Sequence, residues 1–253
     1  MSNVWQSFTE SEQAGRKSLA VLFDPDDTDE RSLIKSLNIC LENRVDYIFV
    51  GGSLVTSNNL NEVVSMIKSY TDIPCVLFPG NAIQIDASAD AILFLSLISG
   101  RNPELLIGQH VVAAPIVKRS NLEVIPTGYM LVSSGKPTSA SYISNSLPLP
   151  NDKPSLAAST ALAGEMLGLK TIYMDAGSGA EEPISNKVIK AVKNGISVPL
   201  IVGGGLNTSA KAKQALDAGA DIIVIGNGAQ KNLNLVTEVS EIVKFYNEAL
   251  NVN

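Results

Sequence analysis

The sequence contains few cysteine, histidine and aromatic residues, and each shortage limits the kind of protein or core that the chain can form. Cys40 and Cys75 lie in apolar surroundings without metal-ligand spacing, so we expect no disulfide framework and a reducing, cytoplasmic setting. The single histidine, His110, excludes a multi-histidine metal site, and we interpret it as structural. Aromatic residues form only 5% of the chain, so the core must consist mainly of Ile, Leu, Val and Ala.

Long apolar runs and excess basic charge are also absent. No stretch approaches the ~18 apolar residues of a membrane span. Residues 1–16 are polar and lack the apolar segment of a signal peptide. The formal net charge is −6, which argues against nucleic acid as a partner, because a nucleic-acid surface carries a basic stripe. An anionic small substrate is still compatible with this charge, since backbone N–H groups bind phosphate without help from lysine or arginine.

What the chain does contain is a regular alternation of aliphatic runs, loop-forming residues and helical stretches. This alternation predicts parallel strands joined by helices. Eight such runs in 253 residues predict an α/β fold, a single (β/α)8 or TIM barrel that forms one domain over residues 1–253. The predicted strands are 19–23, 47–50, 75–78, 91–95, 122–132 with an interruption at 126–128, 171–174, 199–202 and 221–225.

Glycine clusters follow the last three predicted strands. In barrels of this type the loops after strands seven and eight commonly bind phosphate. Glycine permits positive φ and close backbone approach, so that successive N–H groups converge on an anion. Each cluster alone is equally typical of a turn, but three at consecutive strand ends favour a phosphate site. The clusters are Ala176-Gly177-Ser178-Gly179-Ala180, Gly203-Gly204-Gly205 and Gly226-Asn227-Gly228.

Carboxylates follow the first and sixth predicted strands. Asp24 and Asp26 flank Pro25, where oxygen ligands could hold Mg²⁺ together with Ser53 from the neighbouring strand end. The same sequence is also typical of a turn in which Asp24 accepts a hydrogen bond from its own backbone. Asp175 directly precedes the Ala-Gly-Ser-Gly turn, a position suited to a general base or to stabilising a cation.

A long loop is predicted over residues 135–154, which are rich in Ser, Pro and Asn. Loops of this length in compact domains are usually lids or binding loops. We therefore expect this segment to cover a substrate.

In combination these motifs resemble the geranylgeranylglyceryl phosphate synthase family, in order and spacing over nearly the whole chain. No single motif would suffice. The resemblance rests on Leu22-Phe23-Asp24-Pro25-Asp26, Val50-Gly51-Gly52-Ser53, Phe78-Pro79-Gly80, Pro126-Thr127-Gly128-Tyr129, Tyr173-Met174-Asp175-Ala176-Gly177-Ser178-Gly179-Ala180, Val202-Gly203-Gly204-Gly205 and Gly226-Asn227.

The resemblance implies a Mg²⁺-dependent prenyltransferase and a homo-oligomer. Such an enzyme joins the C3 hydroxyl of sn-glycerol 1-phosphate to geranylgeranyl diphosphate, releasing diphosphate and an ether lipid that passes to the membrane. Asp175 and Tyr173 would be catalytic, and Asp24 and Ser53 would hold the metal. The glycerol phosphate would contact Tyr173, Met174, Asp175, Ala176, Gly177, Ser178, Gly179, Gly204, Gly205, Gly226 and Asn227.

Two positions depart from the family pattern. Asp27 stands where the family usually has lysine, so Mg²⁺ or another basic residue would have to compensate. Asp175 stands where the family usually has glutamate, which keeps the charge on a shorter side chain. We hypothesise that Asp175 still serves as the carboxylate near the glycerol hydroxyl.

Three other functions are compatible with parts of the pattern. A heptaprenylglyceryl phosphate synthase would differ in prenyl length, which depends on groove depth, although the Asp-Pro-Asp and Gly-Ser-Gly-Ala runs favour the geranylgeranyl branch. A sugar-phosphate isomerase would need carboxylates after strands one and five, and strand five offers none clearly. An inactive phosphate-binding protein would account for Asp27 and Asp175.

Overall fold

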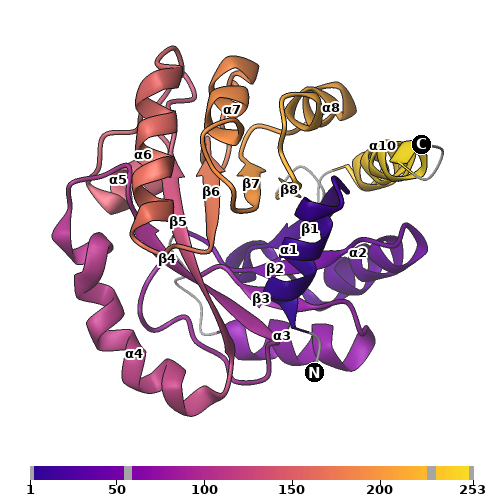
Figure 1. Ribbon diagram of the computed structural model, residues 1–253. Helices are drawn as coiled ribbons and strands as arrows, with labels where there is room; N and C mark the ends of the chain where they lie inside the picture. Colours follow the sequence, from indigo (N-terminus) through magenta and orange to yellow (C-terminus); the bar gives the residue numbers. More distant parts are fainter. Residues whose placement is uncertain (1–2, 54–58, 227–231, 251–253) are drawn as a thin grey trace.

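The computed structural model describes residues 3–53, 59–226 and 232–250 of the chain. Eight parallel strands form a closed barrel in which each strand pairs with the next and the last pairs with the first (Figure 1). The predicted (β/α)8 fold is therefore confirmed. The strands are β1 (Ser18–Phe23), β2 (Tyr47–Val50), β3 (Cys75–Leu77), β4 (Ala91–Leu97), β5 (Glu123–Leu131), β6 (Thr171–Asp175), β7 (Leu200–Gly203) and β8 (Ile222–Ile225).

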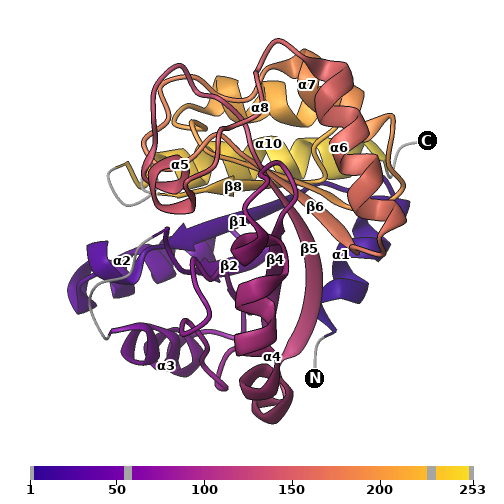
Figure 2. The ribbon, with the colours of Figure 1, turned by 90° about the vertical axis from the view of Figure 1, so that its left-hand side faces the viewer.

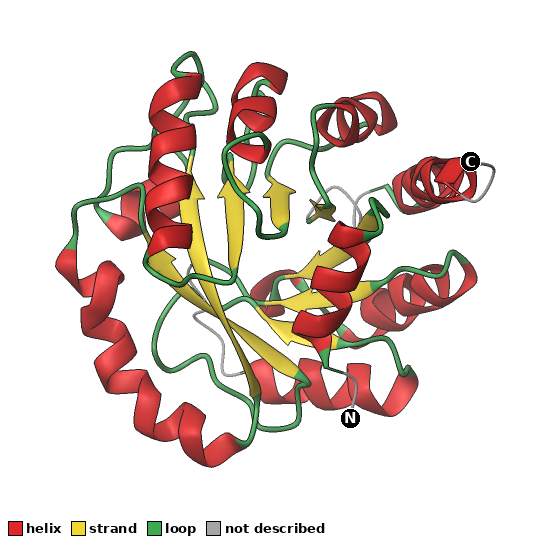
Figure 3. Cartoon of the chain, viewed as in Figure 1, coloured by secondary structure: helices red, strands yellow, loops and turns green. Residues whose placement is uncertain are grey.

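Helices surround the barrel on its outer face (Figure 3). Aliphatic side chains from the strands and from the inner faces of these helices form one outer core, in which both cysteines, Cys40 and Cys75, are buried and unpaired. The helices are α2 (Glu30–Glu42), α3 (Leu60–Tyr70), α4 (Gln109–Ser120), α5 (Ser139–Ser144), α6 (Pro154–Met166), α7 (Asn186–Lys193), α8 (Ser209–Asp217) and α10 (Asn234–Leu250), with short turns η1 (Pro25–Asp27) and η2 (Glu104–Gly108). Within the described ranges, no helix is both long enough and apolar enough to cross a membrane.

The strand positions agree with the sequence to within two residues, but the predicted interruption of the fifth strand is wrong. β5 runs through Pro126 in register with Phe94 of β4, and the Pro126 carbonyl accepts a hydrogen bond from Lys170 N at 2.8 Å. Gly128 is needed for side-chain packing, because a β-carbon there would lie 2.7 Å from the Cδ1 atom of Ile172. The proline and glycine thus fit the strand instead of ending it.

The segment 135–154 is also more regular than predicted. It contains α5, which begins with a capping box at Thr138 and ends at Asn145 in the left-handed conformation. Leu149 then pairs with Val132, and the Asn151 side chain donates to the Pro183 carbonyl at 3.1 Å. These contacts fix the segment over one end of the barrel, opposite α1 (Figure 2).

The helix α1 (Val4–Gln13) closes the N-terminal end of the barrel and was not predicted, because its sequence is mostly polar. Val4 and Phe8 are buried among the side chains that fill the barrel interior. The Phe8 ring meets the Tyr47 ring edge-on, with centroids 4.8 Å apart. The Glu123 carboxylate accepts hydrogen bonds from the first two helical N–H groups, of Val4 at 2.6 Å and Trp5 at 2.9 Å. Such a carboxylate satisfies backbone donors that the helix itself leaves unpaired.

We expect Phe8→Ala to destabilise the protein by about 3–5 kcal/mol, because it leaves a cavity at the closed end of the barrel. Urea unfolding followed by circular dichroism measures the change. Phe245→Ala is the matched control, since the Phe245 side chain is 68% exposed on α10. Equal unfolding midpoints for the two variants would contradict a structural role for α1.

Candidate active site

A polar cavity lies at the C-terminal mouth of the barrel, where strand ends that are distant in sequence meet. It is bordered by the ends of β1, β2, β6, β7 and β8 and by the segment containing α5. The sequence-predicted residues that the structure brings together in its lining are Asp24, Ser53, Tyr173, Asp175, Gly177, Ser178, Gly179, Gly204, Gly205 and Gly226. Asn227 lies outside the described residues.

The glycines after β6 and β7 form one continuous surface. Gly177 and Gly179 have φ of 91° and 71°, and Gly204 and Gly205 have φ of 79° and 70°. A β-carbon at Gly204 would lie 2.6 Å from Ala176 N and 2.7 Å from Gly177 N. The two loops therefore approach so closely that backbone N–H groups of one reach the bare α-carbon of the other. We call this glycine-lined surface the cradle. Ala176 N and Gly177 N already donate to the Gly203 carbonyl and to Asp175, so an anion would be bound by the other N–H groups of the two loops.

We expect Gly204→Ala to weaken phosphate-ester binding roughly ten- to hundredfold, because the added β-carbon would collide with Ala176 N and the Asp175 carboxylate and distort the two loops at a cost of about 1–3 kcal/mol. Calorimetric titration with sn-glycerol 1-phosphate measures the change. Gly135→Ala separates backbone strain from crowding, since Gly135 also has positive φ, 88°, but has nothing within 4 Å of its missing β-carbon. Equal affinities in the two variants would rule out the cradle as the binding site.

The Asp175 carboxylate is buried beneath this cradle with both oxygens engaged. Its Oδ2 accepts a hydrogen bond from the Tyr129 hydroxyl at 2.6 Å, and its Oδ1 accepts one from Gly177 N at 2.7 Å. Burial raises the pKa of Asp175, and these two hydrogen bonds oppose the rise. The result is a carboxylate with increased proton affinity and a fixed orientation, both of which suit a general base.

Three aromatic rings lie side by side below the mouth. Tyr173 stacks on Phe78 with centroids 4.9 Å apart, and Tyr129 meets both rings edge-on. Burial and the charge of Asp175 raise the pKa values of Tyr129 and Tyr173 well above their ordinary value, so both keep their protons. The faces of such rings favour positive charge.

Asp24 adopts the turn that its sequence permits, and it also faces the mouth. Its Oδ1 accepts a hydrogen bond from Asp26 N at 3.1 Å and begins the turn η1. The carboxylate lies against Gly52, where a β-carbon would collide with it. Burial, together with the charges of Asp27 and Asp26, raises the pKa of Asp24. This is a place where a cation would relieve repulsion between carboxylates.

The mouth offers few protein ligands for a metal and little positive charge. Among the described residues, no three His, Cys, Asp or Glu side chains converge on one point. The described side chains of the lining include no lysine or arginine. Nearby, Lys136 pairs with the Glu181 carboxylate at 2.8 Å, and Lys211 donates to the Glu181 carbonyl at 3.4 Å. Anion binding here therefore depends on backbone N–H groups and on any bound cation.

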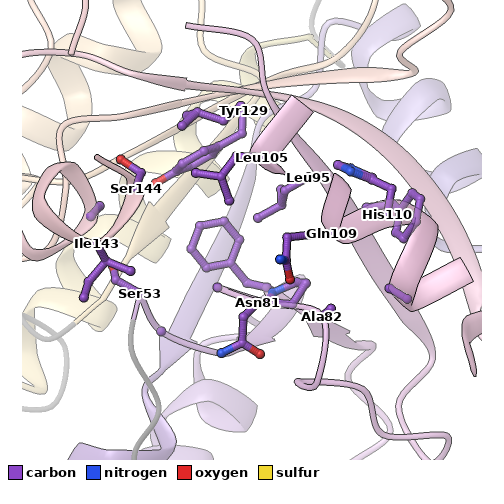
Figure 4. A pocket seen from close by; sticks show the side chains of 18 of the residues that line it. Ser53, Asn81, Ala82, Leu95, Leu105, Gln109, His110, Tyr129, Ile143 and Ser144 are labelled. Atoms are coloured by element: carbon purple, nitrogen blue, oxygen red, sulfur yellow. The ribbon is translucent and has the colours of Figure 1, made fainter. Parts of the chain in front are cut away.

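An apolar pocket adjoins the mouth and shares Gly52, Ser53, Phe78 and Ile143 with it. Figure 4 shows Ser53 and Ile143 on one side of this pocket and His110 on the other. Its remaining walls come from the β3–β4 loop, β4, η2, α4, β5 and α5. They include Ala82, Ile85, Ile92, Phe94, Leu95, Leu97, Leu105, Ala113, Leu131 and Ala140. A long apolar chain would find complementary walls here.

His110, interpreted as structural from the sequence, contributes to the lining of this pocket. Its ring meets Phe94 edge-on with centroids 4.6 Å apart, and its buried Nδ1 has no hydrogen-bond partner within the described part of the chain. Burial lowers the pKa of His110, so the ring is neutral and compatible with an apolar ligand.

Some residues do not have the placement that the sequence indicated. The side chains of Met174 and Ala176 pack into the outer core, so only their backbone can face the mouth.

Tyr129 and Thr138 reach the site without having been assigned a role from the sequence. Tyr129 belongs to the quoted Pro-Thr-Gly-Tyr run, but only the pairing of β5 with β6 places it opposite Tyr173 and beside Asp175. Thr138 covers Gly177, where a β-carbon would lie 2.6 Å from the Thr138 hydroxyl.

Fold and site together define a (β/α)8 barrel whose glycine-lined mouth opens beside an apolar pocket. Residues 12–244 match the model of the PcrB family. The chain belongs to the PcrB family.

Relatives of the same family share most of the chain. It is 52% identical to the geranylgeranylglyceryl phosphate synthase of Spirosoma linguale, over 94% of this chain and 95% of that protein. It is 38% identical to the synthase of the same name from Korarchaeum cryptofilum, over 91% and 94%. The crystal structure of (S)-3-O-geranylgeranylglyceryl phosphate synthase from Thermoplasma acidophilum in complex with sn-glycerol-1-phosphate superposes with a TM-score of 0.91 at 30% identity, covering 97% of this chain and all of that one.

Proposed function

We propose that this chain is a geranylgeranylglyceryl phosphate synthase. It would join the C3 hydroxyl of sn-glycerol 1-phosphate to C1 of geranylgeranyl diphosphate. The observation that carries the proposal is the meeting of two unlike cavities at Ser53 and Phe78, a glycine-lined anion cradle and an apolar pocket. An acceptor held by its phosphate and a donor held by its tail would meet at this junction. Relatives with the same name, at up to 52% identity, support it.

The transfer forms one C–O bond and breaks another. The acceptor oxygen bonds to C1 of the prenyl chain, diphosphate leaves C1 with the bonding electrons, and the hydroxyl proton passes to the Asp175 carboxylate. Tyr129 and Gly177 N orient that carboxylate. Holding both reactants in a fixed geometry replaces much of the entropy cost of their encounter.

Positive charge develops on the allylic carbons as diphosphate departs. The rings of Phe78, Tyr129 and Tyr173 lie between the two cavities, where their faces and their low-dielectric surroundings favour that charge. Tyr173, proposed above as catalytic, acts here through its ring and its protonated hydroxyl.

Mg²⁺ is part of this proposal, and the residues present fit it. Mg²⁺ in phosphate sites is usually held by one or two protein oxygen ligands together with the substrate's phosphates. Asp24 and Ser53 both line the mouth, and Ser53 also lines the apolar pocket that would hold the donor. When bound there, the ion would neutralise the leaving diphosphate. The carboxylates of Asp26 and Asp27 add negative charge that favours a cation.

The proposed function is tested by incubating the protein with sn-glycerol 1-phosphate, geranylgeranyl diphosphate and MgCl₂ and identifying the product by mass spectrometry. We expect the prenylglyceryl phosphate and free diphosphate. A heptaprenyl donor and sn-glycerol 3-phosphate serve as comparisons. Faster turnover of the heptaprenyl donor would favour the alternative synthase, and absence of any ether product would refute the proposal.

We also propose a homo-oligomer in a cytoplasmic setting. Exposed apolar side chains gather on two helices, including Val111, Val112 and Ile116 on α4 and Met166 on α6. Helical faces of this kind usually mark protein contacts. Light scattering coupled to gel filtration should give a multiple of the 26.7 kDa chain mass. Val112→Glu should shift the mass toward the monomer and Phe245→Glu should not, whereas a monomeric parent protein would exclude the assembly.

A further inference from the structure

Three apolar side chains project into solvent from the loops that border the apolar pocket. Ile83 of the β3–β4 loop is 82% exposed, Tyr142 of α5 is 84% exposed, and Leu147 of the following loop is 89% exposed. We call these three residues the apolar rim. Exposure of this degree leaves each side chain without a packing role in the fold.

The rim belongs to the same two loops that form the pocket walls. Ala82 and Ile85, on either side of Ile83, line the pocket from the β3–β4 loop. Ile143 and Ser144 line it from α5, between Tyr142 and Leu147. Figure 4 shows Ala82 and Ile143 facing the pocket from different sides. The exposed apolar side chains therefore continue the surface of the pocket outward.

Charged side chains are few on these two loops, and both carboxylates of the β3–β4 loop are engaged within the protein. Asp86 is buried and accepts a hydrogen bond from Ser88 N at 2.8 Å, and Asp90 pairs with Lys68 at 2.8 Å. Residues 73–85 and 137–151 contain no Asp, Glu, Lys or Arg, although such residues form 17% of the chain. Arg101 lies next to the loop that carries Leu147, and its guanidinium donates to the Gly100 carbonyl at 2.7 Å. The acidic surface of the chain as a whole would be repelled by an anionic surface, but the rim itself is neutral.

The proposed function gives the rim a specific partner chemistry, and the inference rests on it. Both the donor and the product would carry a long isoprenoid tail, and exposing each apolar CH₂ to water costs about 0.8 kcal/mol. A tail that passes between the pocket and a lipid phase without crossing water avoids this cost. Exposed apolar side chains at the edge of the pocket suit insertion among lipid headgroups, because interfacial binding grows with the apolar area that is buried. The broader apolar faces of α4 and α6 suit a protein subunit instead.

We propose that the apolar rim docks the mouth of the barrel on a lipid bilayer, so that the prenyl donor enters and the product leaves through the membrane surface. The association is peripheral. It requires only the three rim side chains and the loops that carry them.

The experiment is flotation of the full chain with phosphatidylcholine vesicles. We expect the parent protein to float and the double variant Ile83→Ser/Leu147→Ser to lose at least about tenfold in the vesicle partition coefficient. Neither side chain lines the pocket or the mouth, so folding and catalysis should be preserved. Phe245→Ser, at 68% exposure on α10, is the matched control and should float like the parent.

A second readout separates this inference from the proposed function. With detergent-dispersed donor, the double variant should turn over at the parent rate, and with donor presented in vesicles its rate should fall. If the parent makes no product at all, the proposed function fails while flotation still reports on docking. A parent that does not float, a double variant that floats like it, or a double variant with altered molar mass in light scattering would overturn the inference.

Discussion

Asp175→Asn is expected to lower kcat at least about a hundredfold, because loss of a positioned general base usually costs 10²–10⁴ in rate. The substitution keeps the size of the side chain in its buried position below Gly204. It removes the negative charge and the ability to accept a proton. Binding of sn-glycerol 1-phosphate should change little, since the cradle consists of backbone N–H groups. Single-turnover kinetics and calorimetry measure the two effects separately.

Two further variants test whether Asp175 is the general base. Asp175→Glu restores the residue usual in the family and should keep most activity. Tyr129→Phe removes the 2.6 Å hydrogen bond that opposes the burial-raised pKa of Asp175, so that pKa should rise further. Because the base must be deprotonated, activity falls as pH drops through its pKa, and the acid limb of the rate profile should move to higher pH in Tyr129→Phe. An Asp175→Ala variant with the parent turnover would disprove the base assignment.

Chelation of divalent cations is expected to lower turnover at least about a hundredfold, because a metal at a departing diphosphate supplies several kcal/mol of charge stabilisation. No cationic side chain in the described part of the mouth can take the place of the metal ion. The lining has no lysine or arginine among its described side chains, and Asp24, Asp26 and Asp27 lie together at the end of β1. Turnover is measured in EDTA and again after MgCl₂ is restored.

The position of Asp27 provides a control within the chain. Asp27→Lys places the family's usual cation beside the diphosphate site, and we expect it to lower the MgCl₂ concentration needed for half-maximal rate. Asp24→Asn should raise that concentration instead. If EDTA leaves the parent rate unchanged, the proposed metal role of Asp24 and Ser53 is wrong. Binding of sn-glycerol 1-phosphate in EDTA should persist, which shows that the protein is still folded.

Sequence patterns predicted the barrel well because its strands are buried on both faces and appear as aliphatic runs. They also predicted that the glycine clusters meet at the mouth, since Gly177 and Gly204 each follow such a run and parallel strands bring their carboxyl ends to one edge. Features that depend on tertiary contact were missed. The polar helix α1 is held by Phe8 and by Glu123, which no local pattern connects to it.

The family resemblance implied an apolar groove, but residue patterns alone could not identify the walls of the pocket. Its walls combine the β3–β4 loop with η2, α4 and α5, and the aliphatic residues of each segment are also those expected of ordinary core. Tyr129 was visible as part of a motif, but its role depends on strand register. Sequence therefore located the residues that bind charge more readily than the surfaces that bind apolar groups.

The closing helix α1 has a consequence for synthesis of the chain on the ribosome. α1 emerges first, yet the carboxylate that caps it, Glu123, lies 119 residues beyond Val4. Until β5 has emerged, Val4 and Phe8 have no complete interior to enter and stay exposed to chaperones and proteases. Docking of α1 therefore cannot be completed before β5 emerges, and we expect a polypeptide truncated before β5 to be degraded instead of accumulating as a half-barrel.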